Sequence, residues 1–136
     1  MRRWAISLLV TAVVCFGTDQ LAFGGLTGND LKKLCVIEGI VTSNENERLI
    51  LKLLHLSCMN YVQGTVTGWQ AGMIMGTLDG TAPEKIGRIC VPESSTAEQW
   101  VDIVNKWLKD HPEKLHNSST LIVIMAIKEA FPCKGQ

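Results

Sequence analysis

The sequence has little charge and no excess of either sign. Lys and Arg together number 13, Asp and Glu together number 13, and only 19% of the 136 residues are charged. A chain without a positive balance has no long-range attraction for nucleic acid or an anionic membrane. No basic run with interleaved aromatic residues occurs either. Nucleic-acid binding is therefore disfavoured.

The sequence also lacks an enzyme signature. Its regularly spaced glycines fall inside a helix-like pattern rather than in a strand-to-helix loop, which excludes a phosphate-binding loop. His55 and Cys58 lie one helical turn apart, a spacing that zinc sites use. The N-terminal residues indicate export, however, and in an exported chain the further thiolates that such a site needs are oxidised to disulfides. We therefore expect no catalytic residue, no metal and no cofactor.

The first 24 residues have the pattern of a signal peptide. Arg2 and Arg3 precede an apolar run over residues 5–17, and small residues follow at 22–24. This pattern predicts cleavage after Gly24, export to the periplasm, and a single helical domain over residues 25–136. Cleavage removes Arg2, Arg3 and Asp19, so 11 of the 13 basic and 12 of the 13 acidic residues remain.

Helix-start residues and apolar spacing predict an all-α fold, a small bundle of about four to five helices. The predicted starts and stops are Thr27 or Asn29 to near Gly39, Asn44 onward through residue 78, Ser95 to Asp110, and Asn117 or Ser118 to Pro132. Asn44 with Glu47 and Ser95 with Glu98 have capping-box spacing.

Four cysteines remain once Cys15 is removed with the signal peptide. An even number in an oxidising compartment predicts two disulfides, each contributing about 2–4 kcal/mol. Spacing alone leaves three connectivities open. Consecutive helices usually run antiparallel, which brings the start of the third helix near the end of the fourth. We therefore predict Cys90–Cys133 and, by subtraction, Cys35–Cys58.

Residues 58–78 contain no charged side chain and place four glycines at four-residue intervals, namely Gly64, Gly68, Gly72 and Gly76. Such spacing puts the glycines on one stripe of a helix. Each costs about 1 kcal/mol relative to alanine, so we expect the stripe to let a neighbouring backbone pack closely. Two alternatives are a membrane span, which the several polar residues of this stretch oppose, and a break at a glycine into two helices.

Residues 79–88 form the longest stretch of loop-like composition after the predicted signal peptide, and Cys90 follows the segment. A loop tethered at one end presents the side chains of its middle to a partner. Trp100 lies at the edge of the apolar stripe of the following helix. The expected partner-binding residues are Asp79, Thr81, Glu84, Lys85, Arg88 and Trp100.

Several motifs resemble the Rap/Tai family of immunity proteins associated with type VI secretion. They are GNDLKKLC, CMNYVQGTVTG, CVPESSTAEQWVDIVNKWLKDHPEK and AFPC, which together extend over the chain after the predicted signal peptide. The segment between Cys35 and Cys58 departs from the family pattern, because it is long and carries an extra helical stretch.

The resemblance implies a periplasmic, disulfide-bonded helical protein that is not an enzyme. Its implied partner is a secreted peptidoglycan amidase, which it binds and inhibits so that the producing cell is not intoxicated. The resemblance also implies a homodimer. The alternative from another class is a periplasmic acid-stress chaperone, which exposes apolar surface when acid neutralises its carboxylates.

Overall fold

The computed structural model of the protein describes residues 25–37, 42–78, 80 and 88–133. The predicted signal peptide at residues 1–24 lies outside them. The described part is all-α, as predicted. Its elements are α2 (Gly28–Cys35), α3 (Glu45–Leu78), α4 (Ala97–Asp110), the 3-10 helix η1 (Pro112–Lys114) and α5 (Ser119–Ala130).

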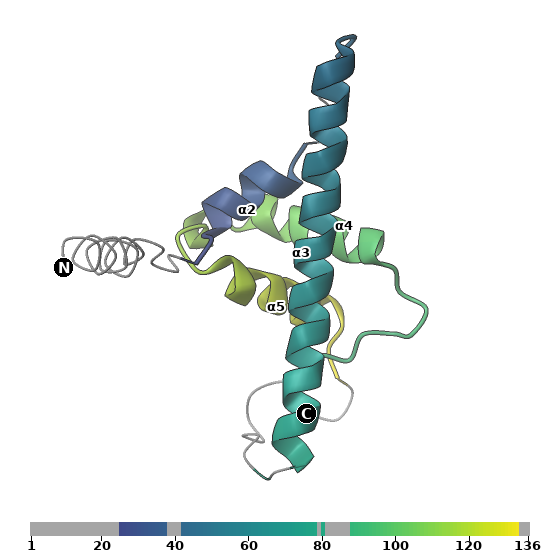
Figure 1. Ribbon diagram of the computed structural model, residues 1–136. Coiled ribbons are helices and arrows are strands. Elements are labelled where there is room, and N and C mark those ends of the chain that lie inside the picture. Colours follow the sequence, from purple (N-terminus) through teal and green to yellow (C-terminus); the bar gives the residue numbers. More distant parts are fainter. Residues whose placement is uncertain (1–24, 38–41, 79, 81–87, 134–136) are drawn as a thin grey trace, which may run out of the picture.

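Helix α3 is the rod on which the other helices are arranged. Its 34 residues give a length of about 51 Å at 1.5 Å per residue. Helices α2, α4 and α5 gather around its middle, and both of its ends extend past them (Figure 1). The rod is continuous, so a break at a glycine is ruled out. Among the described helices, none combines the length and the apolar character that crossing a membrane requires.

The core lies where the middle of α3 meets the other three helices. Cys58, Val62 and Val66 are the buried residues of α3. Helix α5 has the largest share of buried residues among the described helices, because six of its 12 residues are buried. The fully buried large side chains from the other helices are Leu31, Val104, Leu108, Ile122, Val123 and Ile127.

Three glycines of the stripe, Gly64, Gly68 and Gly72, do not pack against another part of the described chain, which corrects the prediction for these three. A Cβ built on Gly64, Gly68 or Gly72 would meet no atom within 4 Å, and all three residues are exposed. Valine and cysteine side chains, not glycines, make the contact between α3 and its neighbours. These three glycines lie away from the buried residues of the helix, so they allow no close backbone approach to the other described residues.

Two disulfides join the predicted cysteine pairs. Cys35–Cys58 links the end of α2 to the middle of α3, with a Cα–Cα distance of 5.1 Å. Cys90–Cys133 links the segment before α4 to the segment after α5, with a Cα–Cα distance of 5.2 Å. Each bridge therefore closes a contact between elements far apart in sequence.

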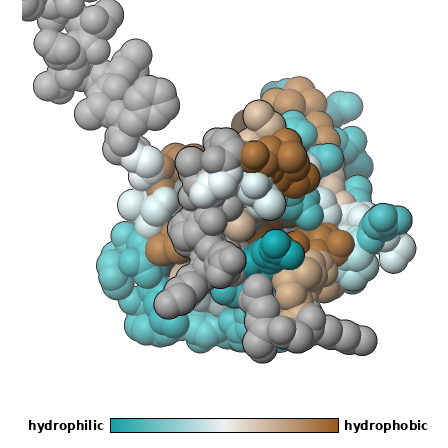
Figure 2. All heavy atoms as spheres, turned by 90° about the horizontal axis from the view of Figure 1, so that it is seen from below, coloured by the Kyte–Doolittle hydropathy of each residue, from teal (hydrophilic) through white to brown (hydrophobic). Residues whose placement is uncertain are grey.

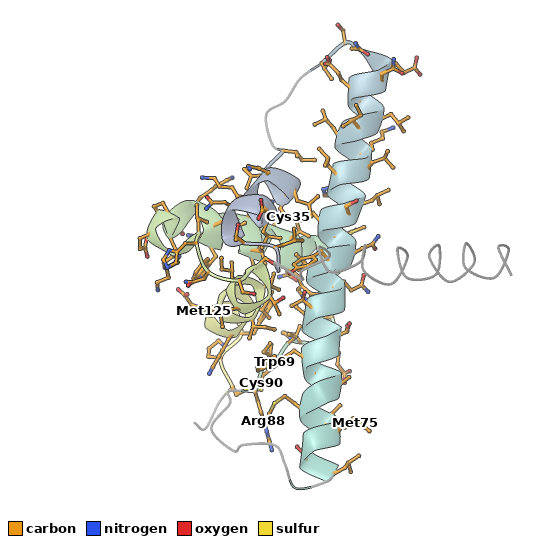
Figure 3. The ribbon with its side chains drawn as sticks, turned by 60° about the vertical axis from the view of Figure 1, so that its left-hand side comes forward. Cys35, Trp69, Met75, Arg88, Cys90 and Met125 are labelled. Atoms are coloured by element: carbon orange, nitrogen blue, oxygen red, sulfur yellow. A yellow bond between two sulfur atoms is a disulfide. The ribbon has the colours of Figure 1, made fainter. Side chains whose placement is uncertain are left out.

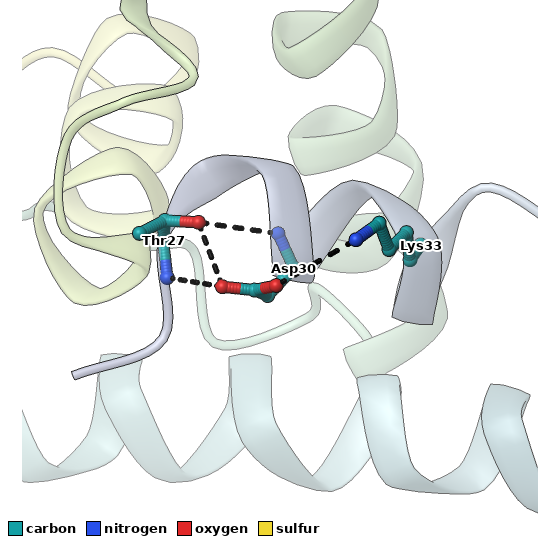
Figure 4. A network of polar contacts seen from close by, with 3 residues as sticks. All are labelled: Thr27, Asp30 and Lys33. Atoms are coloured by element: carbon teal, nitrogen blue, oxygen red, sulfur yellow. Dashed lines mark hydrogen bonds and ion pairs between the residues drawn. The ribbon is translucent and has the colours of Figure 1, made fainter. Parts of the chain in front are cut away.

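The start of α2 is fixed by a capping box between Thr27 and Asp30 (Figure 4). The Thr27 backbone N–H donates to the Asp30 carboxylate at 3.0 Å, and the Asp30 N–H lies 3.4 Å from the Thr27 hydroxyl. Of the two caps that the sequence left open, Thr27 is therefore the one used. At α4 the cap is Thr96, which accepts from the Gln99 N–H, not Ser95 as predicted.

Helices α2 and α5 begin side by side. The Gly28 N–H donates to the Asn117 carbonyl at 2.9 Å, and the Ser119 N–H donates to the Leu26 carbonyl at 2.7 Å. The approach leaves no room at Gly28, where a Cβ would lie 2.3 Å from Ile122 Cδ1 and 2.9 Å from the Leu115 carbonyl oxygen. The close packing at the start of α2 therefore requires a glycine at position 28.

Candidate partner-binding site

A groove of about 400 Å³ lies between the C-terminal turns of α3 and the segment 88–90. We call it the α3 groove. Trp69, Arg88 and Cys90 lie on the same side of α3, whereas Met75 points to the other side (Figure 3). The groove is lined by Trp69, Gln70, Met73, Ile74, Thr77, Leu78, Arg88, Ile89 and Cys90.

The second wall of the α3 groove is held in place by covalent and apolar contacts. The Cys90–Cys133 disulfide attaches it to the chain beyond α5, and Cys133 Sγ lies 3.4 Å from the Arg88 carbonyl oxygen. Between them, the Ile89 side chain is buried in the core. The wall is therefore anchored without belonging to any helix or strand.

The lining is mostly apolar and includes one unpaired donor. The indole Nε1 of Trp69 is buried and has no hydrogen-bond partner among the described residues. An unpaired buried donor costs about 1–3 kcal/mol, and an acceptor supplied by a partner would remove that cost where binding opens access to Nε1. The groove therefore suits a segment that carries an apolar side chain and a carbonyl or carboxylate oxygen.

The rim of the groove is exposed to partners. Arg88 is exposed and brings a positive charge to one edge, and Leu78 at the end of α3 is 79% exposed. Viewed from the end of the molecule where α3 finishes, hydrophobic residues gather in patches beside hydrophilic ones (Figure 2). Apolar patches rimmed by polar residues are typical of protein-binding surfaces.

The structure brings Arg88 to the groove but places Trp100 elsewhere. Trp100 is half-buried, and its Nε1 donates to Ser95 Oγ at 2.9 Å. Ser95 Oγ in turn donates to the Pro92 carbonyl at 2.7 Å, so Trp100 holds the turn that leads into α4. The other expected contact residues, Asp79, Thr81, Glu84 and Lys85, lie outside the described residues.

A second, smaller depression of about 240 Å³ lies between α4 and α5. Its polar groups already have partners. Trp107 Nε1 donates to Glu129 at 3.0 Å, and Lys106 pairs with Asp110. The hydrogen bond from Lys106 holds the pKa of the Asp110 carboxyl below its ordinary value. A partner would gain less here than at the α3 groove, where the indole donor is unpaired.

The zinc alternative at His55 and Cys58 is ruled out by the fold, because the Cys58 sulfur is bonded to Cys35. Within the described ranges no three His, Cys, Asp or Glu side chains come together as metal ligands.

Sequence reasoning missed the α3 side of the groove. Trp69 packs against the core and also lines the groove. Met73 and Ile74 had no signal of their own. The uncharged run continues through residue 78, beyond the last buried residue of α3, Val66. This was the available indication that the end of the helix offers an uncharged surface.

The comparisons with known proteins agree with this picture of a binding protein. A model of the family described as Rap1a immunity proteins matches residues 27–133, which include both disulfides and all the described helices. Neither the search of curated proteins nor the search of solved structures gives a match. The family match covers most of the chain, and the protein therefore belongs to the Rap1a family of immunity proteins.

Proposed function

We propose that this protein is exported to the periplasm, where it binds and inhibits a peptidoglycan amidase delivered by type VI secretion. It thereby protects the cell that makes it. The observation that carries the proposal is the family match over residues 27–133. Two disulfides support the location, because such bonds persist in oxidising compartments such as the periplasm.

Inhibition in this proposal needs binding only. A cell-wall amidase must admit a peptide to its cleft, and a tightly bound protein at the mouth of the cleft excludes that peptide. The α3 groove and the segment 79–88, which follows Leu78 of the groove in sequence, would make this contact. Arg88 would face an acidic group, and the groove would receive an apolar side chain of the amidase. The homodimer implied by the family resemblance would present the groove twice.

Co-expression in the bacterial periplasm tests the proposal. The amidase to be tested is sought among cell-wall hydrolases encoded beside this gene, and lysis is followed by optical density. We expect lysis with the amidase alone, protection by this protein, and recovery of a complex on co-purification. Equal lysis with and without the protein, and no complex, would contradict the immunity function.

Matched variants test the α3 groove itself. Met73→Glu puts a charge into the groove at a half-buried position, and Gln99→Glu adds the same charge to the exposed side of α4. We expect Met73→Glu to lose protection and Gln99→Glu to keep it, while both retain the helical circular dichroism spectrum. The opposite result would move the binding site from the groove to α4.

A further inference from the structure

The two disulfides differ in how far solvent reaches them. Cys35 and Cys58 are 2% and 0% exposed, and their bridge lies where α2 meets the middle of α3. The buried Asn105 side chain donates to the Cys35 carbonyl at 3.2 Å, so α4 also contacts this end of the bridge. Cys90 lies further along α3 (Figure 3) and is exposed, and Cys133 is half-buried. A thiolate must reach a sulfur atom to exchange with it, so the second bridge is the one open to attack in the folded protein.

The exposed bridge joins two segments that lie outside the helices. Cys90 precedes α4, and Cys133 follows α5. Among the described residues, no hydrogen bond between backbone groups holds residues 89–91. Besides the disulfide, the contacts of this wall are the apolar packing of Ile89 and Val91 on the core. The bond therefore fixes a wall of the α3 groove that has no secondary structure of its own to hold it.

We propose that Cys90 is a site of thiol–disulfide exchange, at which a protein dithiol of the Cys-X-X-Cys class reduces the Cys90–Cys133 bridge while Cys35–Cys58 stays intact. A thiolate of the dithiol attacks Cys90 Sγ. The bond to Cys133 breaks, a mixed disulfide forms at Cys90, and Cys133 leaves as a thiolate that takes up a proton. The second cysteine of the dithiol then attacks its own partner sulfur and releases Cys90 as a thiol. The bridge gains two electrons and two protons, and the dithiol becomes a disulfide.

The surroundings of Cys133 favour it as the leaving group. Its Sγ lies 3.4 Å from the Arg88 carbonyl oxygen, and a thiol S–H is a weak donor to such an oxygen. A sulfur atom within a disulfide has no hydrogen to donate, so this acceptor comes into use only after the bridge opens. Protonated Cys133 is therefore stabilised in place, and the more exposed Cys90 is the sulfur that the incoming thiolate reaches.

The helices stay packed when the bridge opens. Helices α4 and α5 contact each other and α3 through buried apolar side chains that include neither cysteine of this bridge. The Cys35–Cys58 bridge still joins α2 to α3. The groove wall, however, loses its covalent attachment to the chain beyond α5, and a wall that must become ordered on binding holds a partner less tightly. Exchange at Cys90 thus regulates the α3 groove without unfolding the protein. The effect on inhibition rests on the proposed function, whereas the exchange itself does not.

Limited reduction followed by peptide mapping tests the exchange without the amidase. The oxidised protein is treated with dithiothreitol in native buffer, and free thiols are alkylated with iodoacetamide at intervals. We expect Cys90 and Cys133 to be alkylated at least about 10-fold faster than Cys35 and Cys58, because exposed disulfides are the labile ones. In urea, where both bridges are exposed, the rates should become similar. Equal rates in native buffer, or faster opening of Cys35–Cys58, would overturn the proposal.

A thioredoxin whose second active-site cysteine is replaced by serine tests which sulfur is attacked, because its reaction stops after the first step. We expect a mixed disulfide whose peptide contains Cys90. A mixed disulfide at Cys133 would reverse the assignment of attacked and leaving sulfur. Absence of any mixed disulfide would show that a protein dithiol does not reach this bridge.

Protein reduced at this bridge alone, freed of reductant and assayed without alkylation, tests the effect on the groove. We expect a helical circular dichroism spectrum and inhibition of the amidase weaker by about 10-fold, as the ordering of a wall implies. The same sample after reoxidation is the matched control and should inhibit like untreated protein. Loss of the helical spectrum, or unchanged inhibition, would contradict regulation of the groove. Untreated protein that does not inhibit the amidase would refute the proposed function, while the reduction rates of the two bridges would still decide the exchange.

Discussion

Cys90 and Cys133 are joined by a disulfide that ties the segment before α4 to the segment after α5. Because Cys90 also lines the α3 groove, the same bond stabilises the fold and holds one wall of the candidate site. Loss of the bridge should therefore affect stability and partner binding together.

The double variant Cys90→Ser with Cys133→Ser tests that link. For a sequence separation of 43 residues, the chain-entropy view predicts a loss of about 4 kcal/mol in unfolding free energy. Urea denaturation measures the loss, and amidase inhibition should weaken in the same variant. Thiol titration of the exported wild type should find no reactive cysteine. Four reactive thiols in a folded protein would contradict the role of the bridges.

Gly28 should be intolerant of any side chain. Gly28→Ala places a methyl group against Ile122 and the Leu115 carbonyl, and overpacking of this kind costs about 1–3 kcal/mol. Gly72→Ala is the matched control, since its Cβ would meet open space and alanine favours the helix by up to about 1 kcal/mol. Thermal denaturation should show the first variant less stable and the second slightly more stable. Equal melting temperatures would contradict the packing at Gly28.

The helices could be predicted from the sequence, because capping residues and apolar spacing are local signals. The disulfide pairs could be predicted because consecutive helices usually run antiparallel. The local signals left Thr27 and Asn29 open at α2 and wrongly favoured Ser95 over Thr96 at α4, since neighbouring residues of similar chemistry can each cap a helix. The tight contact at Gly28 depends on residues almost a hundred positions away. The i, i+4 glycines marked a bare surface on α3, but spacing alone does not say whether the partner is in the same chain.

The α3 groove was less predictable than the fold. It depends on where the segment 88–90 crosses α3, which is a tertiary relationship fixed by the second disulfide. The sequence placed Arg88 in a partner-binding segment, but it gave no reason to join Trp69 to that segment. Whether the Trp69 indole donor has a hydrogen-bond partner depends on the positions of all neighbouring acceptors, and these are known only from the structure.

Tyr61 and Ser119 should be energetically coupled. The Tyr61 hydroxyl lies 2.6 Å from Ser119 Oγ and 3.1 Å from Thr120 Oγ1, and Ser119 is buried. Tyr61→Phe should lower the unfolding free energy by about 1 kcal/mol. A double-mutant cycle with Ser119→Ala should give a smaller total loss than the sum of the two single losses. Simple additivity would show that the contact contributes nothing.

Stability should fall in acid partly through Asp30. The hydrogen bonds from Thr27 lower the pKa of the Asp30 carboxyl, and Lys33 adds to the effect. A carboxyl with a depressed pKa in the folded state stabilises the fold above its unfolded pKa of about 4, and the stabilisation is lost as the pH falls through the folded value. The melting temperature of wild type should exceed that of Asp30→Asn at pH 6, and the two should converge as the pH falls through the lowered pKa of Asp30 in the folded state. A gap independent of pH would contradict this role.

Trp69→Phe separates partner binding from folding. The substitution removes an indole donor that has no partner in the free protein and keeps most of the ring packing. We expect the amidase to be inhibited several-fold less well, as loss of one hydrogen bond of about 1 kcal/mol implies. The thermal midpoint serves as the folding control. Unchanged inhibition would show that the indole donor makes no contact with the amidase.

The most direct test of the account is a titration of the purified amidase with the purified, disulfide-bonded protein, with peptidoglycan hydrolysis as the readout. The account predicts that activity falls linearly and reaches its minimum when the chains are equimolar, and that Met73→Glu shifts this curve to much higher protein concentration. Full hydrolysis in the presence of a large excess of folded wild-type protein would contradict it.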